Sequence, residues 1–305
     1  MYDVLIIGGG PAGIYCGYVA HNKGLKAILV ESNDSLGGQP LLIYSQKPIY
    51  DYPAFCGIKA YELTNKLIDQ LVNHSETKVL LKTTIKSYSK EDKLFKVTLT
   101  NNEVIETKAI IIACGGGIFK PNRLENISSE NKNIHYLVQP LDVYKNKKVV
   151  VLGGGDSAVD WANELISSHI TDDVSIVHRR DQFRANGENV EKLSKNKIKI
   201  FLNCLIEKIT NKEIVLNNKK LIPYDFLIVQ YGQSVDNSWK EIFKDLQMNQ
   251  NNRIPVKQNQ MTNLDNIYAI GNVCIYEGKP SSIVTAHGEA TVAVRDIINK
   301  NMQIK

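Results

Sequence analysis

Two glycine-rich segments have the residue types and the spacing that bind a pyrophosphate. The first reads Gly8-Gly9-Gly10-Pro11-Ala12-Gly13, and the second reads Gly153-Gly154-Gly155-Asp156-Ser157-Ala158. Each follows a short aliphatic run, 4–7 or 149–152, and fits the pattern G-x-G-x-x-G/A of a strand-to-helix turn. In such a turn the backbone approaches the phosphates closely, and the helix N-terminus attracts their charge. Two turns of this kind predict two dinucleotides that are held together for electron transfer.

The residues that follow the two turns predict different nucleotides. Glu31 ends the strand after the first turn, about twenty residues on, where an acid binds a ribose hydroxyl. This favours FAD or NAD. The second turn is followed instead by His178-Arg179-Arg180, with Arg184 a turn further on. Arginines neutralise and fork onto a 2′-phosphate, so NADP(H) is favoured over NAD(H), although exposed arginines can also form a merely solvated basic surface.

Aromatic residues gather after Gly37-Gly38-Gln39. They are Tyr44, Tyr50, Tyr52 and Phe55. Aromatic rings next to a nucleotide site can stack on an isoalloxazine ring. By composition alone, such residues are more often part of the core, and both interpretations stay open here.

The elements that must position these residues form two similar units. The first is predicted to contain a strand at 3–7, a helix over 11–23 and a strand at 27–30. The second begins at Lys147 and is predicted to contain a helix over 157–168 and a strand at 174–177. Further strands are predicted near 78–81, 94–100, 109–113, 198–202, 205–209, 213–216 and 226–229.

The block after Gly232 contains a predicted strand at 266–270 and a helix over 288–299. It is too small for a core of its own, so we expect it to return to the first unit. Crossings at 117–121 and 232–236 then form a hinge. The predicted class is α/β, with two three-layered, Rossmann-like domains whose central sheets are mostly parallel. A discontinuous FAD domain covers 1–118 and 235–305, and an NADP(H) domain covers 119–234.

Composition excludes several other classes of protein. The 305 residues are 43% hydrophobic and 23% charged, with a net charge of +5 and no dense basic run, which argues against nucleic-acid binding. No apolar stretch is long enough to span a membrane. The first strand begins at Tyr2 and leaves no room for a signal peptide, so a cytoplasmic location is expected. The five cysteines form no C-x-x-C pair, their spacing fits no metal site, and we expect inert thiols.

Together these motifs resemble the low-molecular-weight thioredoxin reductase group of flavoproteins. Within it, the chain is most similar to ferredoxin–NADP(+) reductases of the thioredoxin-reductase-like type. Besides the two turns, the resemblance rests on Glu31, 37–39, 50–51, 117–121, 157–162, 178–184 and 274–279. It extends over nearly the whole chain.

The resemblance implies FAD contacts at Glu31, Gln39 and Tyr44, with Tyr44 stacked on the flavin. It also implies that the Ile85 backbone lies at the adenine end and that Phe119 lies beside the cofactor. Asn272 stands where the family has an acid that contacts the ribityl chain. An amide is isosteric with a carboxylate and can still hydrogen-bond, so we expect FAD to be retained. Members of the resembled family commonly cover the other flavin face with an aromatic or histidine residue that follows the last helix. This sequence has no aromatic after Tyr276, so we expect that face to be more open.

The missing cysteine pair determines the expected reaction. Thioredoxin reductases carry a C-x-x-C shortly before the second turn, but residues 136–142 contain no cysteine. Electrons from NADPH are therefore expected to pass through the flavin directly to an external acceptor, without a catalytic side chain. The resemblance implies that this acceptor is ferredoxin or flavodoxin, and we expect a homodimer. Two alternatives remain: an NADPH diaphorase that reduces quinones, and a poorly active sensor that binds FAD and NADP(H).

Overall fold

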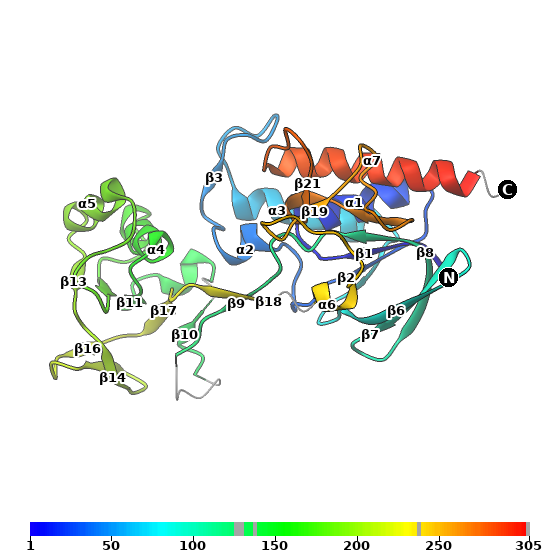
Figure 1. The fold of residues 1–305 in the computed structure, drawn as a ribbon. Coiled ribbons are helices and arrows are strands. Elements are labelled where there is room, and N and C mark those ends of the chain that lie inside the picture. The colour runs from blue at the N-terminus through cyan, green and yellow to red at the C-terminus, as the bar shows by residue number, and fades with distance from the viewer. Residues whose placement is uncertain (125–130, 137–138, 237–238, 303–305) are drawn as a thin grey trace. The chain divides into compact units, whose positions relative to one another are not determined.

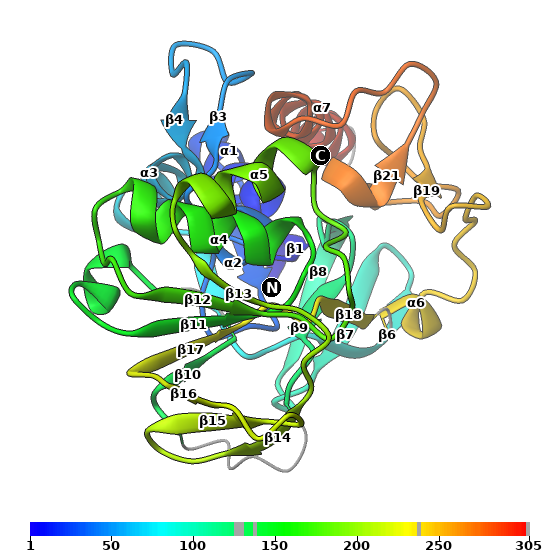
Figure 2. The same cartoon turned by 90° about the vertical axis from the view of Figure 1, so that its left-hand side faces the viewer.

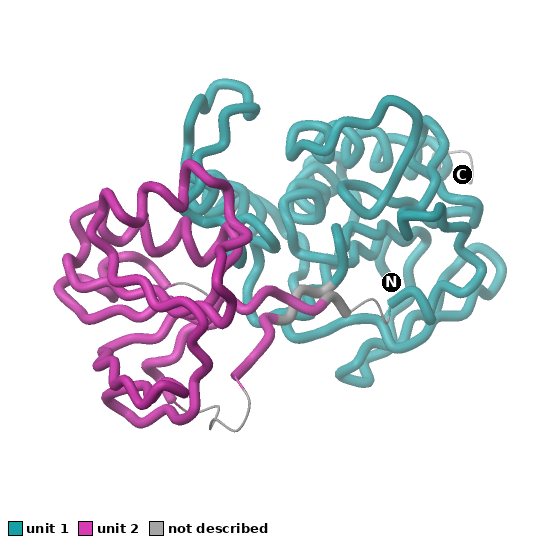
Figure 3. The backbone as a smooth tube through the Cα atoms, turned by 60° about the vertical axis from the view of Figure 1, so that its left-hand side comes forward, with its two compact units in different colours: residues 1–119, 235–305 teal, residues 120–234 magenta. Residues whose placement is uncertain are grey.

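A computed structural model describes residues 1–124, 131–136, 139–236 and 239–302; it describes 118–120, 235–236 and 301–302 by their backbone alone. The chain divides into two compact units, residues 1–119 with 235–305 and residues 120–234 (Figure 3). Among the described residues, no helix is both long enough and apolar enough to cross a membrane.

Unit 1 is built on a mixed sheet that is parallel at its centre. Its order is β5-β2-β1-β8-β7-β6, with β20 also paired to β8. The strands are β1 (Tyr2–Ile7), β2 (Ala27–Val30), β5 (Lys78–Leu80), β6 (Ile85–Glu91), β7 (Leu94–Leu99), β8 (Val104–Ile112) and β20 (Ile267–Ala269). Because β20 pairs in parallel with 110–112, the C-terminal block completes this sheet.

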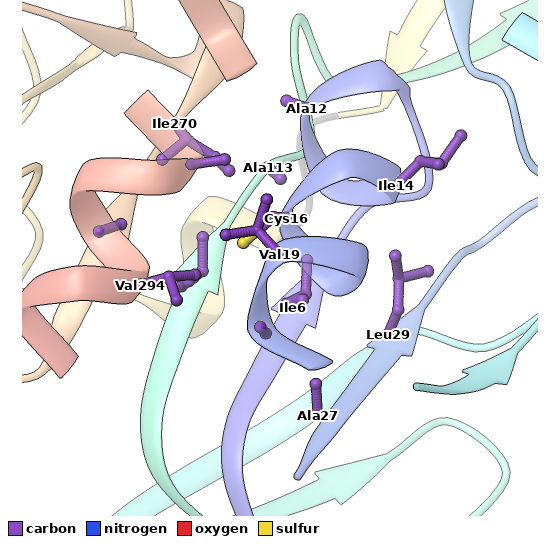
Figure 4. Close-up of a cluster of buried hydrophobic side chains, with 14 of the residues drawn as sticks. Ile6, Ala12, Ile14, Cys16, Val19, Ala27, Leu29, Ala113, Ile270 and Val294 are labelled. Atoms are coloured by element: carbon purple, nitrogen blue, oxygen red, sulfur yellow. The ribbon is translucent and has the colours of Figure 1, made fainter. Parts of the chain in front are cut away.

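Three helices cover one face of this sheet (Figure 1). They are α1 (Pro11–Asn22), α3 (Ala60–Asn73) and α7 (Ile283–Met302). The helix α3 buries Leu63, Leu67 and Leu71, whose spacing places them on one side of a helix. With Ile6 and Leu29 of the strands they belong to one apolar core, part of which Figure 4 shows. On the opposite face, side chains of β1, β2 and β8 share a second apolar core with side chains of β6, β7 and the short helix α6 (Trp239–Ile242).

Unit 2 has a parallel sheet between two different layers (Figure 2). The sheet order is β10-β17-β11-β12-β13. Its strands are β10 (Ile134–His135), β11 (Val149–Leu152), β12 (Val174–Val177), β13 (Lys199–Phe201) and β17 (Phe226–Val229). The helices α4 (Asp156–Ser167) and α5 (Gly187–Lys195) pack on one face. An antiparallel sheet of β14 (Ile206–Ile209), β15 (Glu213–Leu216) and β16 (Leu221–Pro223) packs on the other.

Short elements connect these layers. They are α2 (Gln39–Leu42), β3 (Pro48–Ile49), β4 (Ile58–Lys59), β9 (Ile118–Pro121), a 3-10 helix at Leu141–Tyr144, β18 (Gln233–Asp236), β19 (Ile254–Pro255), a 3-10 helix at Gly271–Val273 and β21 (Cys274–Ile275). The strands β9 and β18, where the chain passes between the units, pair with each other. The last helix begins at Ile283 rather than Gly288, and the Ser282 hydroxyl accepts the Thr285 N–H at 3.1 Å just before it.

Candidate functional site

The turn after β1 is packed so closely that two of its positions require glycine. Gly8 has a φ of +108°, and a Cβ there would lie 2.7 Å from the carbonyl oxygen of Ala113. A Cβ on Gly13 would overlap the carbonyl oxygen of Gly8. Gly10 differs, because the nearest atom to a Cβ there would be 4.0 Å away. The turn thus brings strand and helix together and leaves the backbone at Gly10 open to a ligand.

A cleft of about 1140 Å³, including the part open to solvent, lies over this turn within unit 1. The predicted FAD residues that line it are Gly8, Gly10, Pro11, Ala12, Glu31, Gln39, Tyr44 and Asn272. The start of α7 also lines it, through residues 281–283 and Ala286. A helix N-terminus presents free N–H groups and a partial positive charge, which favours an anionic ligand.

Glu31 is fixed beside the turn by four hydrogen bonds. Its Oε2 accepts the Gly9 N–H at 2.6 Å. Its Oε1 accepts the Asn33 N–H at 2.8 Å, the Asn33 side-chain amide at 2.9 Å and the Ser32 hydroxyl at 3.1 Å. Since a carboxylate oxygen accepts about two hydrogen bonds, Oε2 retains capacity for a ribose hydroxyl. The open glycine, the helix N-terminus and this anchored acid together fit the adenosine pyrophosphate half of FAD.

Three predicted FAD residues do not line the cleft with a described side chain. Gly13 lies beneath the turn. The Ile85 side chain is buried in the core, whereas the contact expected of Ile85 is through its backbone; its neighbour Thr84 lines the cleft. Phe119 is in β9, but its side chain is outside the described residues.

The structure also separates the four aromatic residues. Tyr44 lines the cleft, and burial, with a smaller effect of Asp51, raises the pKa of its hydroxyl. Tyr50 is 71% exposed, whereas Tyr52 packs edge-on against His287 in unit 1. Tyr44 is therefore the member of this group that is placed to contact a ligand.

Several lining residues were missed by sequence reasoning. Trp239 reaches the cleft from α6, and its indole N–H is buried without a partner among the described residues. No motif around it signals this position. Cys114 also lines the cleft, and burial raises the pKa of its thiol to about 12. A neutral thiol of this kind does not act as a nucleophile.

The turn after β11 has the same open and closed positions. Gly153 has a φ of +144°, and a Cβ there would overlap the Gln230 carbonyl oxygen. No atom of the described residues lies within 4 Å of a Cβ built on Gly155. The Arg184 N–H donates to the Gly154 carbonyl at 2.8 Å, and the Asn186 N–H donates to Asp156 Oδ1 at 2.9 Å. These bonds tie the segment 184–186 to the turn.

The His178 side chain packs against this turn. Its ring lies against Gly154, where a Cβ would overlap it, and stacks on Phe183 with centroids 5.7 Å apart. Burial, with a smaller effect of the neighbouring arginines, lowers the pKa of His178, so the ring is neutral at pH 7. Arg179, Arg180 and Arg184 are exposed and available to a phosphate. Ser157 and Ala158 belong to the first turn of α4, with Ala158 buried.

Comparisons with known proteins agree with this geometry. The model of the pyridine nucleotide-disulphide oxidoreductase family matches residues 2–290. The ferredoxin–NADP reductase of Streptococcus sanguinis is 42% identical, over 98% of this chain and 94% of its own. That of Malacoplasma penetrans is 37% identical, over 96% and 95%.

Solved structures show the same fold. The thioredoxin reductase of T. acidophilum has a TM-score of 0.67 at 21% identity, covering 99% of both chains. That of Lactococcus lactis has a TM-score of 0.65 at 24% identity, covering 98% of both chains. The predicted two-domain α/β fold and the predicted resemblance are both confirmed. This chain belongs to the pyridine nucleotide-disulphide oxidoreductase family.

Proposed function

We propose that this protein takes electrons from NADPH through FAD and passes them to a ferredoxin or a flavodoxin. The enzyme type and the two cofactors predicted from the sequence are confirmed by the family and by the ferredoxin–NADP reductase relatives. The observation that carries the proposal is the cleft over the first turn, with Glu31 anchored in it. When bound, FAD accepts a hydride from NADPH and gives single electrons onward.

The residues of unit 1 would hold and orient FAD. The open backbone at Gly10 and the start of α1 receive the pyrophosphate, and Glu31 binds the adenosine ribose. Tyr44, which lines the cleft, would stack on the flavin, and the exposed Asn272 would hydrogen-bond near the ribityl chain. An amide there both donates and accepts, unlike a carboxylate. No side-chain acid or base is assigned, because the cofactor supplies the chemistry.

The residues of unit 2 would select NADP(H). Gly153 allows the close packing of the turn and Gly155 leaves room for the pyrophosphate, while Arg179, Arg180 and Arg184 would pair with the 2′-phosphate. His178 supports the turn instead of contacting the phosphate directly, since its ring is buried against Gly154. This modifies the contact that the sequence alone predicted for His178.

The acceptor follows from the cysteines. The segment 136–142 has no cysteine, and no C-x-x-C occurs anywhere in the chain. A dithiol therefore has no place between the flavin and the acceptor, so electrons would pass directly from the flavin to an external acceptor. The ferredoxin–NADP reductase relatives favour a one-electron protein carrier as that acceptor. A homodimer and a cytoplasmic location belong to the same proposal, and sedimentation of the purified protein tests the dimer.

The test compares acceptors after anaerobic reduction by NADPH. The purified protein should be yellow, and NADPH should bleach its flavin absorption. Ferredoxin, flavodoxin, thioredoxin and a quinone are then supplied separately at low and high salt. We expect turnover with ferredoxin or flavodoxin that falls with salt, because the net charge of +5 attracts an acidic carrier. Robust thioredoxin reduction contradicts the proposal, and reduction of the quinone alone favours a diaphorase.

A further inference from the structure

A buried ion pair lies directly behind the wall of the cleft. Lys279, in the loop between β21 and α7, pairs with Glu289 of α7, and each side chain is 2% exposed. Glu289 accepts the Gly271 N–H through Oε2 at 2.6 Å, and Gly271 lines the cleft. The pair is therefore in direct contact with the segment that presents Asn272 to the cleft.

The carboxylate of Glu289 is held on both oxygens. Oε1 accepts the Tyr276 hydroxyl at 3.0 Å in addition to the Lys279 ammonium. The Lys279 nitrogen is also 3.3 Å from Cys274 Sγ and 5.0 Å from the centre of the Tyr276 ring. Burial, with the bond to Glu289, raises the pKa of Tyr276 to about 12, so its hydroxyl remains a donor at physiological pH. With both oxygens tied, Glu289 has one preferred position.

The bond from Gly271 is well placed to set the geometry of the cleft. Gly271 has a φ of +73°, and a Cβ there would lie 3.0 Å from the Cβ of Ala12 in the first glycine turn. On its other side, the Ile270 N–H donates to the Ile112 carbonyl at 3.0 Å, which fixes the end of β20. The segment 271–273 is thus held between β8, α1 and α7, with the Asn272 side chain exposed in the cleft.

Stability alone is a poor reason for such a pair. Desolvation of two charges costs about as much as their attraction returns, and apolar replacements of similar volume are often equally stable. A buried pair instead favours one arrangement of its neighbours. We propose that Lys279 and Glu289 form a positioning pair, which fixes the turn 271–273 and thereby the contact of Asn272 with bound FAD. The inference rests on the proposed function, because it takes FAD to occupy the cleft.

The test measures the release of FAD from the holoprotein after dilution, by the rise in free-flavin fluorescence. Lys279→Met with Glu289→Leu removes both charges and the acceptor for the Gly271 N–H. Lys279→Met with Glu289→Gln removes the charges but keeps an acceptor. The matched control is Lys300→Met, which removes a different lysine, in α7, from its more exposed pair with Asp265 (2.9 Å, side chains 31% and 62% exposed). We expect FAD release to quicken about tenfold in the double variant with Glu289→Leu and about two- to threefold in the double variant with Glu289→Gln. Lys300→Met should leave the release rate unchanged.

The same variants are then combined with Asn272→Ala. If the pair acts through Asn272, the Leu variant should quicken release by less than about twofold in this background, because the contact it positions is already gone. Equal effects in both backgrounds overturn the inference, as does an unchanged release rate in the Leu variant.

Two further measurements keep the inference testable. Should the Leu variant not fold, Tyr276→Phe removes a single hydroxyl from Glu289 and should quicken release about two- to threefold in the native background alone. A change of the same size beside Asn272→Ala counts against the positioning role. A native protein that binds no FAD overturns both the proposed cofactor site and this inference. If the native protein binds FAD but the effects of the pair variants and of Asn272→Ala on FAD release are additive, only the inference is overturned.

Discussion

The glycine turns after β1 and β11 can be compared residue by residue, because their strands pair in the same register. Ile7 pairs with Val30, and Leu152 pairs with Val177. The N–H of the first glycine in each turn bonds the last carbonyl of the second strand, at 2.8 Å from Gly8 and 3.0 Å from Gly153. Glu31 and His178 therefore occupy the same position, one residue beyond that strand.

At this shared position the two side chains make different kinds of contact with their turns. Glu31 accepts the N–H of the middle glycine, Gly9, and keeps a buried acceptor beside the cleft. His178 packs its ring under the middle glycine, Gly154, and makes no polar contact with it among the described residues. Under the proposed function, the first unit would select its nucleotide by a fixed, buried carboxylate. In the second, the exposed arginines beyond the histidine would bind the phosphate.

The largest expected effect comes from removing the buried acceptor. Glu31→Ala takes away the ribose contact and also leaves the Gly9 N–H without its partner. We expect FAD binding to weaken by about 3 kcal/mol, or roughly a hundredfold, measured by titration of the flavin-free protein. Asp34→Ala, which removes an exposed acid three residues on, is the control. Similar losses in both variants would mean that general charge, and not the anchored carboxylate, matters.

The second prediction concerns the exposed arginines. Arg179→Ala with Arg180→Ala should raise the KM for NADPH by ten- to a hundredfold, or about 1.5–3 kcal/mol, and leave that for NADH nearly unchanged. Lys219→Ala removes a similar exposed charge from unit 2 and should change neither. Salt should weaken NADPH binding more than FAD binding, because exposed charges are screened. Equal loss for both nucleotides would contradict the 2′-phosphate assignment.

The last position of the pattern G-x-G-x-x-G/A offers a matched pair of substitutions. Gly13 and Ala158 are equivalent, yet a Cβ at Gly13 overlaps Gly8, while the second turn accepts alanine. Gly13→Ala should lower the free energy of unfolding of unit 1 by about 1–3 kcal/mol. Ala158→Gly should cost about 0.5–1 kcal/mol in unit 2, because glycine is a poorer helix former. Thermal unfolding of both variants checks this, and equal costs would show that the first turn relaxes.

The smallest predicted effect is an acid titration. His287 in unit 1 and His178 in unit 2 are both buried with a pKa lowered by burial, that of His287 to about 4. A histidine held neutral stabilises the fold above its unfolded pKa of about 6.5, and this contribution is lost as the pH falls toward the folded value. Between pH 7 and 5.5 the free energy of unfolding of the native protein should therefore fall by about 1 kcal/mol because of His287. Chemical denaturation at both pH values measures this difference in free energy of unfolding. The part due to His287 should disappear in His287→Phe, and an unchanged difference would show that His287 does not contribute to it.

Local sequence patterns determined much of this protein. Within each unit, the turn, the two strands beside it and the residue that follows the second strand lie within about thirty residues of each other, and the motif encodes their contacts. The charge at positions 31 and 178–180 could be read in the same way. The helix over 60–73 was not predicted, although its leucines recur every four residues and the local sequence therefore indicates it.

The tertiary structure decided what the distant parts of the chain contribute. Trp239 lines the cleft because α6 packs on the far side of the sheet, and Gly271 meets Ala12 because β20 pairs with β8. The buried partnership of Lys279 with Glu289 likewise depends on where α7 lies. Such contacts join segments with no shared periodicity, so only the packed chain determines them. Their physical basis is burial, because a polar side chain that loses contact with water must take its partners from whatever segments pack beside it.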